Sequence, residues 1–490
     1  MLGHSLLNVE SLVALGVLVV LFVRSRNIEA AVENKPSRYP AVFLALCCAI
    51  LLVYWPVLSA PFVYDDYTHI ADAQHSTGRL MLASFGPVEH KPGLFFRPFG
   101  FLVYWLNYLV AGADPRLWHA ASISFHAVSA CLLFALCRQL RFSWIGSASS
   151  AFLFALNAAS VEAVAWIDAR FDPMSTGLVL LSLVCVCRFL NSGSYGWMIL
   201  ACLAGACAMY SKESAFCLPF LAAALWFSGQ DRKRLVEACV CLAVLAAVLF
   251  CYRWWALGGI GGYRGAQFSP LRTLNAVFVR DWTVLFFPVN WSGRPGRLFE
   301  GMIYLAPLAL FACAWLARVP KRVYLGCIAL TTLAALPVEH LLLIGTDLAN
   351  SRIVYLLAVG WALLWGAVFT AIPRSHWRAL AIVWMLTWHT VMLRHNLEFW
   401  LRIPRQAQSV CTAFGRTVAA AEGPVVVRGL PHRIDGVVFL ANGFAECVAR
   451  NGGVPASRVT TTNGDANFEW NEISGSIEPT HSATRPSGPP

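Results

Sequence analysis

Two adjacent carboxylates, Asp65 and Asp66, follow a long apolar stretch near the start of the chain. Residues 40–60 carry no charged side chain and are long enough to cross a bilayer. The acidic pair therefore emerges where the membrane surface begins, and a carboxylate there can take a proton from a hydroxyl group. Two aspartates after a span can equally be solvated loop residues. A catalytic interpretation therefore depends on which other side chains lie on the same side of the membrane.

Further ionisable side chains sit at the ends of apolar segments on the same side. They are Arg97, Glu162, Asp168, Arg170, Asp172, Lys212, Glu213 and Arg352. Charge near membrane depth is costly, so such residues tend to line a wet functional site. Cations hold a phosphate while a carboxylate accepts a proton, so the set suits an anionic, lipid-linked substrate. For each residue alone, a loop charge or a structural ion pair is the alternative.

The composition excludes an ordinary soluble protein. The chain has 490 residues, of which 58% are hydrophobic and 13% charged, and its mean hydropathy is +0.61. We therefore expect a polytopic, predominantly α-helical membrane protein with the lipid bilayer as a partner. The net charge of +11 comes from Lys and Arg in short loops, as cytoplasmic loops require, so we expect no nucleic-acid partner.

The distribution of positive charge predicts the topology. A first apolar segment, 6–23, precedes Arg24 and Arg26, which places the N-terminus outside and residues 24–39 in the cytoplasm. Residues 98–111 are short for a span, and treating them as a surface helix keeps every later basic cluster cytoplasmic. About twelve spans result. After 6–23 and 40–60 they are 117–138, 143–158, 173–190, 195–211, 214–228, 235–257, 301–318, 323–345, 349–371 and 377–393.

Four regions follow from this pattern. An extra N-terminal helix and loop occupy 1–39, and the membrane domain occupies 40–393. A small extracytoplasmic α/β segment occupies 394–475, and a disordered tail follows at 476–490. Within the membrane domain, Arg280 and Asp281 make 274–289 a surface or re-entrant helix.

The extracytoplasmic segment should begin with an amphipathic helix at 397–421. Strands are expected at 425–427 and 437–440, followed by a turn at Asn442-Gly443. Most cysteines act as small apolar residues in the spans. Cys411 and Cys447 could form a disulfide if the segment faces an oxidising compartment.

Several motifs resemble one family. The motifs are Tyr-Asp-Asp-Tyr-Thr-His-Ile at 64–70, Phe-Arg-Pro-Phe at 96–99, Gly-Ala-Asp-Pro-Arg-Leu-Trp-His at 112–119, the stretch 161–172, Ser-Lys-Glu at 211–213 and Ser-Arg-Ile-Val-Tyr-Leu at 351–356. Together they resemble the polytopic, lipid-dependent glycosyltransferases of the GT-C fold. Within these, the transmembrane and tetratricopeptide-repeat O-mannosyltransferases and their bacterial relatives are the most similar. The likeness spans residues 50–400.

The resemblance implies a mechanism. It makes Asp65 the catalytic base, with Asp66 as its neighbour, and brings Lys212 and Arg352 to the phosphate of a polyprenyl-phosphate sugar. We expect transfer to a hydroxyl acceptor on a protein, glycan or lipid without a cofactor, and displacement of the phosphate from one face would invert the anomeric centre. The expected location is a bacterial inner membrane, with the site facing the periplasm. The chain departs from the family in lacking tetratricopeptide repeats and in reading Ala158–Ser160 where relatives often carry His-Pro.

Two other classes of protein remain as alternatives. A transporter would have a similar number of spans, but transporters usually show related halves and binding residues near the bilayer midplane. Here the charges gather at one face, which favours the enzyme. A catalytically inactive GT-C-like scaffold is the third class. A metal between Asp65 and Asp66 is left out because too few further oxygen ligands lie nearby in the sequence.

Overall fold

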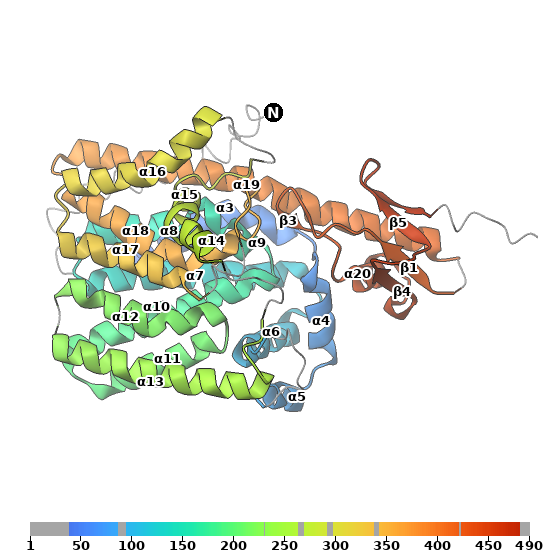
Figure 1. The fold of residues 1–490 in the computed structure, drawn as a ribbon, viewed down its shortest axis with the longest axis horizontal. Helices are drawn as coiled ribbons and strands as arrows, with labels where there is room; N and C mark the ends of the chain where they lie inside the picture. Colours follow the sequence, from blue (N-terminus) through green and yellow to red (C-terminus); the bar gives the residue numbers. More distant parts are fainter. Residues whose placement is uncertain are drawn as a thin grey trace, which may run out of the picture.

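The structure is a computed structural model that describes residues 39–86, 95–229, 231–262, 269–291, 297–337, 343–420 and 423–480. Its helices lie side by side in a bundle, and a smaller C-terminal segment extends from one end of that bundle (Figure 1). The predicted first span, 6–23, and the loop after it lie outside the described residues.

Among the described residues, six helical segments are long and apolar enough to cross a membrane, and each coincides with a predicted span. They are α3 (Tyr39–Tyr54) with η3 (Trp55–Ser59), α7 (Pro115–Gln139), α8 (Trp144–Ala155) with η4 (Ala158–Ser160) and α9 (Val161–Ala165), η5 (Asp168–Arg170) with α10 (Phe171–Ser192), α13 (Arg232–Leu257), and η9 (Ser351–Ile353) with α18 (Val354–Ala371). The expected polytopic helical membrane protein is confirmed.

Shorter helices occupy most of the remaining predicted spans. They are α11 (Tyr195–Met209), η6 (Glu213–Cys217) with α12 (Leu218–Ala224) and η7 (Leu225–Ser228), α16 (Arg297–Leu316) and α17 (Lys321–Ala335). At the end of the bundle nearer the C-terminal segment lie α4 (Asp65–His75), α5 (Gly78–Ala83) and α6 (Pro98–Ala111). With 14 residues, α6 is a short apolar helix with the bounds expected from the sequence, and its place at the membrane surface stays a prediction.

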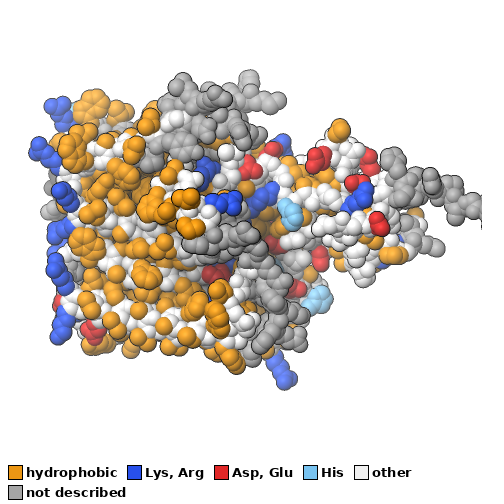
Figure 2. Space-filling view, in the orientation of Figure 1, with side chains coloured by type: hydrophobic (Ala, Val, Ile, Leu, Met, Phe, Trp, Pro, Cys, Tyr) orange, Lys and Arg blue, Asp and Glu red, His pale blue; other side chains and the backbone are white. Residues whose placement is uncertain are grey.

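The outer surface of the bundle is apolar where lipid would contact it. On α13, Val236, Val240, Val244 and Val248 recur every four residues and are 55–63% exposed. Hydrophobic side chains cover the middle of the bundle, whereas Lys and Arg gather along its left edge (Figure 2). This is the pattern of a bilayer-spanning bundle with a basic cytoplasmic end.

Hydrogen bonds identify the basic end of the bundle. The Arg234 guanidinium, near the start of α13, donates to the Leu190 carbonyl oxygen near the end of α10 at 3.1 Å. Asn191, next to Leu190, donates to Gln139 at the end of α7. Because α7 and α10 end where α13 begins, their basic flanks share one side, as the predicted topology requires.

The last helix of the bundle corrects the prediction. Residues 377–393 and 397–421 were expected to form two helices, but α19 (Ser375–Val418) is one continuous helix of 44 residues. At 1.5 Å per residue it is roughly 66 Å long, about twice the thickness of the bilayer core. It therefore runs from the bundle directly into the C-terminal segment (Figure 1).

Asn396 explains why α19 does not break at the predicted boundary. This buried side chain donates to the carbonyl oxygens of Ala158 and Pro288 and accepts from the Asn290 backbone N–H. The polar residues that looked like a boundary are therefore packed against other parts of the chain.

The C-terminal segment is a small α/β unit, as predicted. Its four-stranded sheet has the order β4 (Val459–Thr462), β1 (Val425–Arg428), β5 (Phe468–Asn471), β6 (Ser476–Pro479), and β2 (Arg433–Ile434) pairs with β3 (Val437–Val438). The sheet mixes parallel β1 pairs with an antiparallel β5–β6 pair. Strand β6 lies within residues 476–490, which were predicted to be a disordered tail. Residues Ser476–Pro479 are instead ordered, because they pair with β5.

The helix α20 (Phe444–Gly452) was not predicted. The expected Asn442-Gly443 turn instead provides its start, with Gly443 at a φ of 68°. A disulfide joins Cys411 of α19 to Cys447 of α20. Such bonds persist in oxidising compartments, which supports placing this segment outside the cytoplasm.

The second external loop also forms helix. It comprises α14 (Pro270–Asn275), the π-helical turn η8 (Ala276–Arg280) and α15 (Asp281–Phe286). The Arg280 guanidinium donates to the carbonyl oxygens of Ile344 and Gly345. Among the described residues, this segment is not one of the six span-length helices, and its place at the surface or as a re-entrant helix stays a prediction.

The topology predicts which positions an impermeant thiol reagent reaches from outside. Cysteines introduced at the exposed residues Arg79 and Ile473 should react in intact cells, whereas Arg232→Cys and Lys321→Cys should react only after permeabilisation. The unsubstituted chain gives the background from native cysteines. Labelling of the Arg232 and Lys321 positions from outside would invert the topology.

Candidate active site at the outer end of the bundle

Asp66 ties two loops together. Its Oδ2 accepts from the Val63 N–H at 3.0 Å, and its Oδ1 accepts from the Asp168 N–H at 2.9 Å. The side chain is buried, with 1% of its surface exposed. Because both oxygens serve backbone donors, Asp66 holds the loop before α4 against η5, which is a positioning role.

Asp65 points elsewhere and is only partly buried. It follows Tyr64, whose φ of 57° and ψ of −124° turn the chain sharply into α4. The Asp65 Oδ1 accepts from the Asn442 side-chain amide at 3.1 Å. Burial and the nearby Asp168 carboxylate raise the pKa of Asp65 to about 6, although His69, Asn442 and Arg352 act in the opposite direction. Asp65 is thus ionised at neutral pH and more basic than an ordinary aspartate.

His69 belongs to the site although the sequence analysis did not select it. Its Nδ1 lies 2.5 Å from Asp168 Oδ1. Burial disfavours the imidazolium, but Asp168, with smaller contributions from Asp65 and Asp72, raises the pKa of His69 to about 9. His69 is therefore a cation at neutral pH. The signal for it was the spacing, since residues i and i+4 share one face of a helix, as Asp65 and His69 do on α4.

Glu162 is a fully buried carboxylate shared by two arginines. Its Oε1 accepts from the guanidinium groups of Arg352 at 2.7 Å and Arg433 at 3.0 Å, and its Oε2 accepts from the Arg352 N–H. The Arg352 guanidinium also lies over the Trp166 ring. Arg433 comes from β2 of the C-terminal segment, so Glu162 joins that segment to the bundle.

Two further ion pairs involve four more of the predicted residues. Lys212 donates to the Asp172 carboxylate, and both side chains are largely buried. Arg97 forms a two-pronged contact with Glu213, and Arg253 approaches the same carboxylate at 3.4 Å. Each cation thus reaches the site with a carboxylate that orients it.

Arg170 has a different environment from the one expected. Its guanidinium donates to the Ile167 carbonyl, the Asn107 side chain and the Trp118 carbonyl, and it packs on the rings of Tyr104 and Trp118. Only 1% of the residue is exposed. This arrangement favours a structural role that fixes η5 over the substrate-binding role predicted from the sequence.

The other predicted residues form one electrostatically connected cluster. Arg352 interacts with the carboxylates of Asp65, Asp168 and Asp172, and Arg97 interacts with Asp168 and Asp172. Asp168 links the cluster to His69, and Asp172 links it to Lys212. Within the described part of the chain, no group of three or more His, Cys, Asp or Glu side chains is arranged to hold a metal ion.

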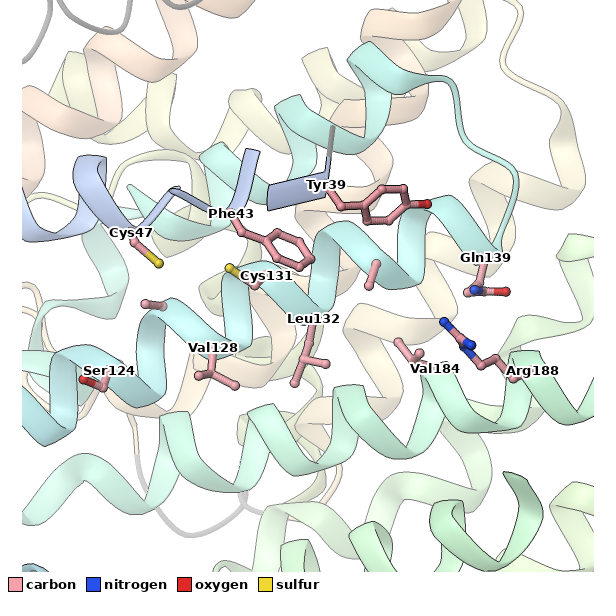
Figure 3. A pocket seen from close by; sticks show the side chains of 12 residues that line it. Tyr39, Phe43, Cys47, Ser124, Val128, Cys131, Leu132, Gln139, Val184 and Arg188 are labelled. Carbon is pink, nitrogen blue, oxygen red and sulfur yellow. The ribbon is translucent and has the colours of Figure 1, made fainter. Parts of the chain in front are cut away.

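A groove of about 780 Å³ lies elsewhere, in the apolar part of the bundle (Figure 3). Residues of α3, α7 and α10 line it, among them Phe43, Val128 and Val184, with Arg188 and Gln139 towards its basic end. None of the site residues lines this groove. It is therefore separate from the charged cluster at the outer end.

Breaking the buried ion pairs of Glu162 should destabilise the protein much more than breaking an exposed ion pair. Glu162→Gln removes the charge opposite two arginines, and breaking such a pair costs about 3–5 kcal/mol. Glu469→Gln is the matched control, because the Arg428–Glu469 pair is 39% and 48% exposed and worth at most about 1 kcal/mol. In detergent, Glu162→Gln should lower the apparent unfolding temperature by several degrees more than the control. Equal shifts would contradict a structural role for Glu162.

Known proteins with similar sequences match part of the chain. No family model matches it. It is 33% identical over 181 residues to Protein O-mannosyl-transferase Tmtc1 of Drosophila melanogaster, covering 35% of this chain and 21% of that protein. It is 30% identical over 266 residues to Protein O-mannosyl-transferase Tmtc2 of the same organism, covering 50% of this chain and 28% of that protein. The chain thus matches less than a third of the length of these curated relatives.

A solved structure resembles the chain over most of its length. It is the archaeal oligosaccharyltransferase AglB from Archaeoglobus fulgidus in complex with an inhibitory peptide and a dolichol-phosphate. The TM-score is 0.50 at 12% identity, over 85% of this chain and 64% of that one. At this identity the likeness shows the fold. The chain is therefore an integral membrane protein with a GT-C-like fold, and its sequence resembles the transmembrane and tetratricopeptide-repeat O-mannosyltransferases.

Proposed function

We propose that the chain is an inverting glycosyltransferase that moves a sugar from a polyprenyl-phosphate donor to a hydroxyl acceptor. The observation that carries this proposal is Asp65, a partly exposed carboxylate of raised pKa in one cluster with the cations Arg97, Lys212 and Arg352. A base beside several cations at the membrane surface suits a reaction between a hydroxyl group and a lipid-linked phosphate.

The proposed step needs no additional reactant. Asp65 accepts the proton of the acceptor hydroxyl as its oxygen bonds to the anomeric carbon of the sugar. The bond between that carbon and the phosphate oxygen breaks, and the electron pair leaves with the polyprenyl phosphate. Because the attack comes from the face opposite the leaving group, the anomeric configuration inverts. Asp65, with a pKa of about 6, is deprotonated and ready to accept at neutral pH.

Lys212 and Arg352 are the proposed phosphate ligands. Arg352 supplies a planar fork suited to phosphate oxygens, and Lys212 supplies a compact charge. Arg352 is paired with Glu162, and Lys212 is paired with Asp172. These carboxylates keep the two cations oriented near the surface of the bundle. The leaving phosphate carries more negative charge in the transition state, so these cations would stabilise that state more than the bound donor.

The finer identities of the substrates are proposals as well. Mannose is the first sugar to test, because the relatives are named O-mannosyl-transferases. The acceptor is a hydroxyl group on a protein or on an envelope glycan or lipid. We place the reaction at the outer face of a plasma membrane, such as a bacterial inner membrane. The Cys411–Cys447 disulfide supports an oxidising compartment on that side.

The two aspartates should respond differently to the same substitution. Asp65→Asn keeps the size of the side chain but removes its basicity, so sugar transfer in proteoliposomes should fall by about two to four orders of magnitude. The unfolding temperature should stay near that of the unsubstituted chain. Asp66→Asn leaves one acceptor oxygen for two backbone donors, so it should lower the unfolding temperature.

Three results would bear against this assignment. Near-normal transfer by Asp65→Asn would remove Asp65 as the base. Movement of an unmodified labelled solute across the bilayer, without sugar transfer, would favour a transporter. Donor binding without turnover by the unsubstituted chain would favour an inactive scaffold.

A further inference from the structure

The C-terminal segment contacts the loop that carries Asp65 from several sides. Asn442 donates to Asp65, the His432 ring meets the Tyr64 hydroxyl at 3.0 Å, and Asn451 donates to the Tyr67 hydroxyl at 3.2 Å. Arg450 lies over the Phe62 ring, with 5.0 Å from its guanidinium carbon to the ring centroid. These contacts join residues 432–451 to residues 62–67, which are far apart in the sequence.

Gly443 makes the closest approach between the two parts. A Cβ at this position would lie 2.2 Å from the Tyr64 carbonyl oxygen, closer than any real Cβ contact. The Gly443 φ of 68° also favours glycine. The backbone of the C-terminal segment therefore rests directly on Tyr64, whose own positive φ is uncommon for a tyrosine.

The contacting residues are themselves anchored. The disulfide ties α20 to α19, and the Arg450 guanidinium donates to the Ala113 carbonyl oxygen at 2.6 Å. Arg433 binds the buried Glu162 and the Asn350 side chain. A sharply turned backbone persists when its surroundings fix it, and these anchors supply rigid surroundings.

We propose that residues 432–451 form a clamp that holds the Tyr64–Asp65 turn, and that within it Asn442 is a positioning residue for the Asp65 carboxylate. The C-terminal segment is then a working part of the active site. The clamp stands on the contacts alone, whereas the role of Asn442 in turnover rests on the proposed function.

The groups around Asp65 determine how the pKa of its carboxylate would change if the Asn442 side chain were removed. Asp65 faces His69 on its own helix, Asp168 of η5, Arg352 of η9 and Asn442 of the C-terminal segment. Asn442 donates to the ionised carboxylate and so lowers its pKa. Without this donor, Asp65 should hold its proton to a higher pH, and its carboxylate should be less well oriented.

A pair of glycines tests the clamp without an activity assay. Gly443 and Gly453 flank α20 with φ values of 68° and 73°, but nothing lies within 4 Å of a Cβ at Gly453. Gly443→Ala and Gly453→Ala therefore share the backbone strain and differ in the contact with Tyr64. In the full-length chain in detergent, Gly443→Ala should speed hydrogen exchange in peptides covering 62–70 by roughly threefold or more relative to Gly453→Ala. Equal exchange in the two variants would overturn the clamp.

A pair of asparagines tests the positioning role. The probes are labelled undecaprenyl-phosphate mannose and dolichyl-phosphate mannose with a mixture of Ser- and Thr-containing peptides. Asn442→Ala should lower kcat roughly tenfold with little change in the donor KM, and the acid limb of the kcat profile should move to a higher pH than in the unsubstituted chain. Asn471→Ala is the control, because the bonds of Asn471 lie within 471–478 of the distant sheet.

The two arms separate the two proposals. A kcat profile of Asn442→Ala that superimposes on that of Asn471→Ala would overturn the positioning role. If the unsubstituted chain transferred no sugar from any donor while the glycine pair still differed in exchange, the proposed function would fail and the clamp would be supported.

Discussion

The buried carboxylate of Glu162 is the interaction on which the outer end of the molecule depends. An isolated charge at the edge of an apolar bundle is prohibitively costly, so its position dictates where its partners must be. Glu162 holds Arg352 by backbone and side chain and holds Arg433 from a segment 271 residues away. This group therefore connects the start of η9, the cation proposed to bind phosphate, and the C-terminal segment.

The same rule shapes the rest of the cluster. Arg97, Lys212 and His69 each meet a carboxylate, from Glu213, Asp172 and Asp168 respectively. Asp65 instead accepts a hydrogen bond from a neutral amide, Asn442. A carboxylate paired with a cation loses basicity, whereas one bonded to an amide in a half-buried place keeps more of it. Asp65 is thus bonded to an amide, whereas Glu162, Asp168, Asp172 and Glu213 each orient a cation.

Much of the fold was predictable because its signals are local. Charge-free runs such as 40–60 and the basic residues at their ends depend only on neighbouring sequence, and the span-length helices appear where these runs predicted them. The emergence of Asp65 and Asp66 at the outer end followed from the same runs. The different roles of the two aspartates follow from the different directions in which adjacent helical side chains point.

The remaining features depend on distant contacts. Arg394 and His395 looked like the end of a span, but they bond to the carbonyl oxygens of Val53 and Asn290, and α19 continues past them. Asn442 lies 377 residues from Asp65, and no local pattern connects them. The burial of Arg170 depends on aromatic rings from other helices. Only His69 had an unused local signal, its helical spacing from Asp65.

The stereochemistry of the product tests the central claim most directly. The purified chain in proteoliposomes would be given a panel of labelled polyprenyl-phosphate sugars of known anomeric configuration, with mannose first, and the product linkage would be determined by NMR. A single carboxylate base acting on one displacement predicts complete inversion, together with release of one polyprenyl phosphate for each sugar transferred. Retention of configuration would require two successive displacements or attack from the face of the leaving phosphate, and would contradict the single displacement assigned to Asp65.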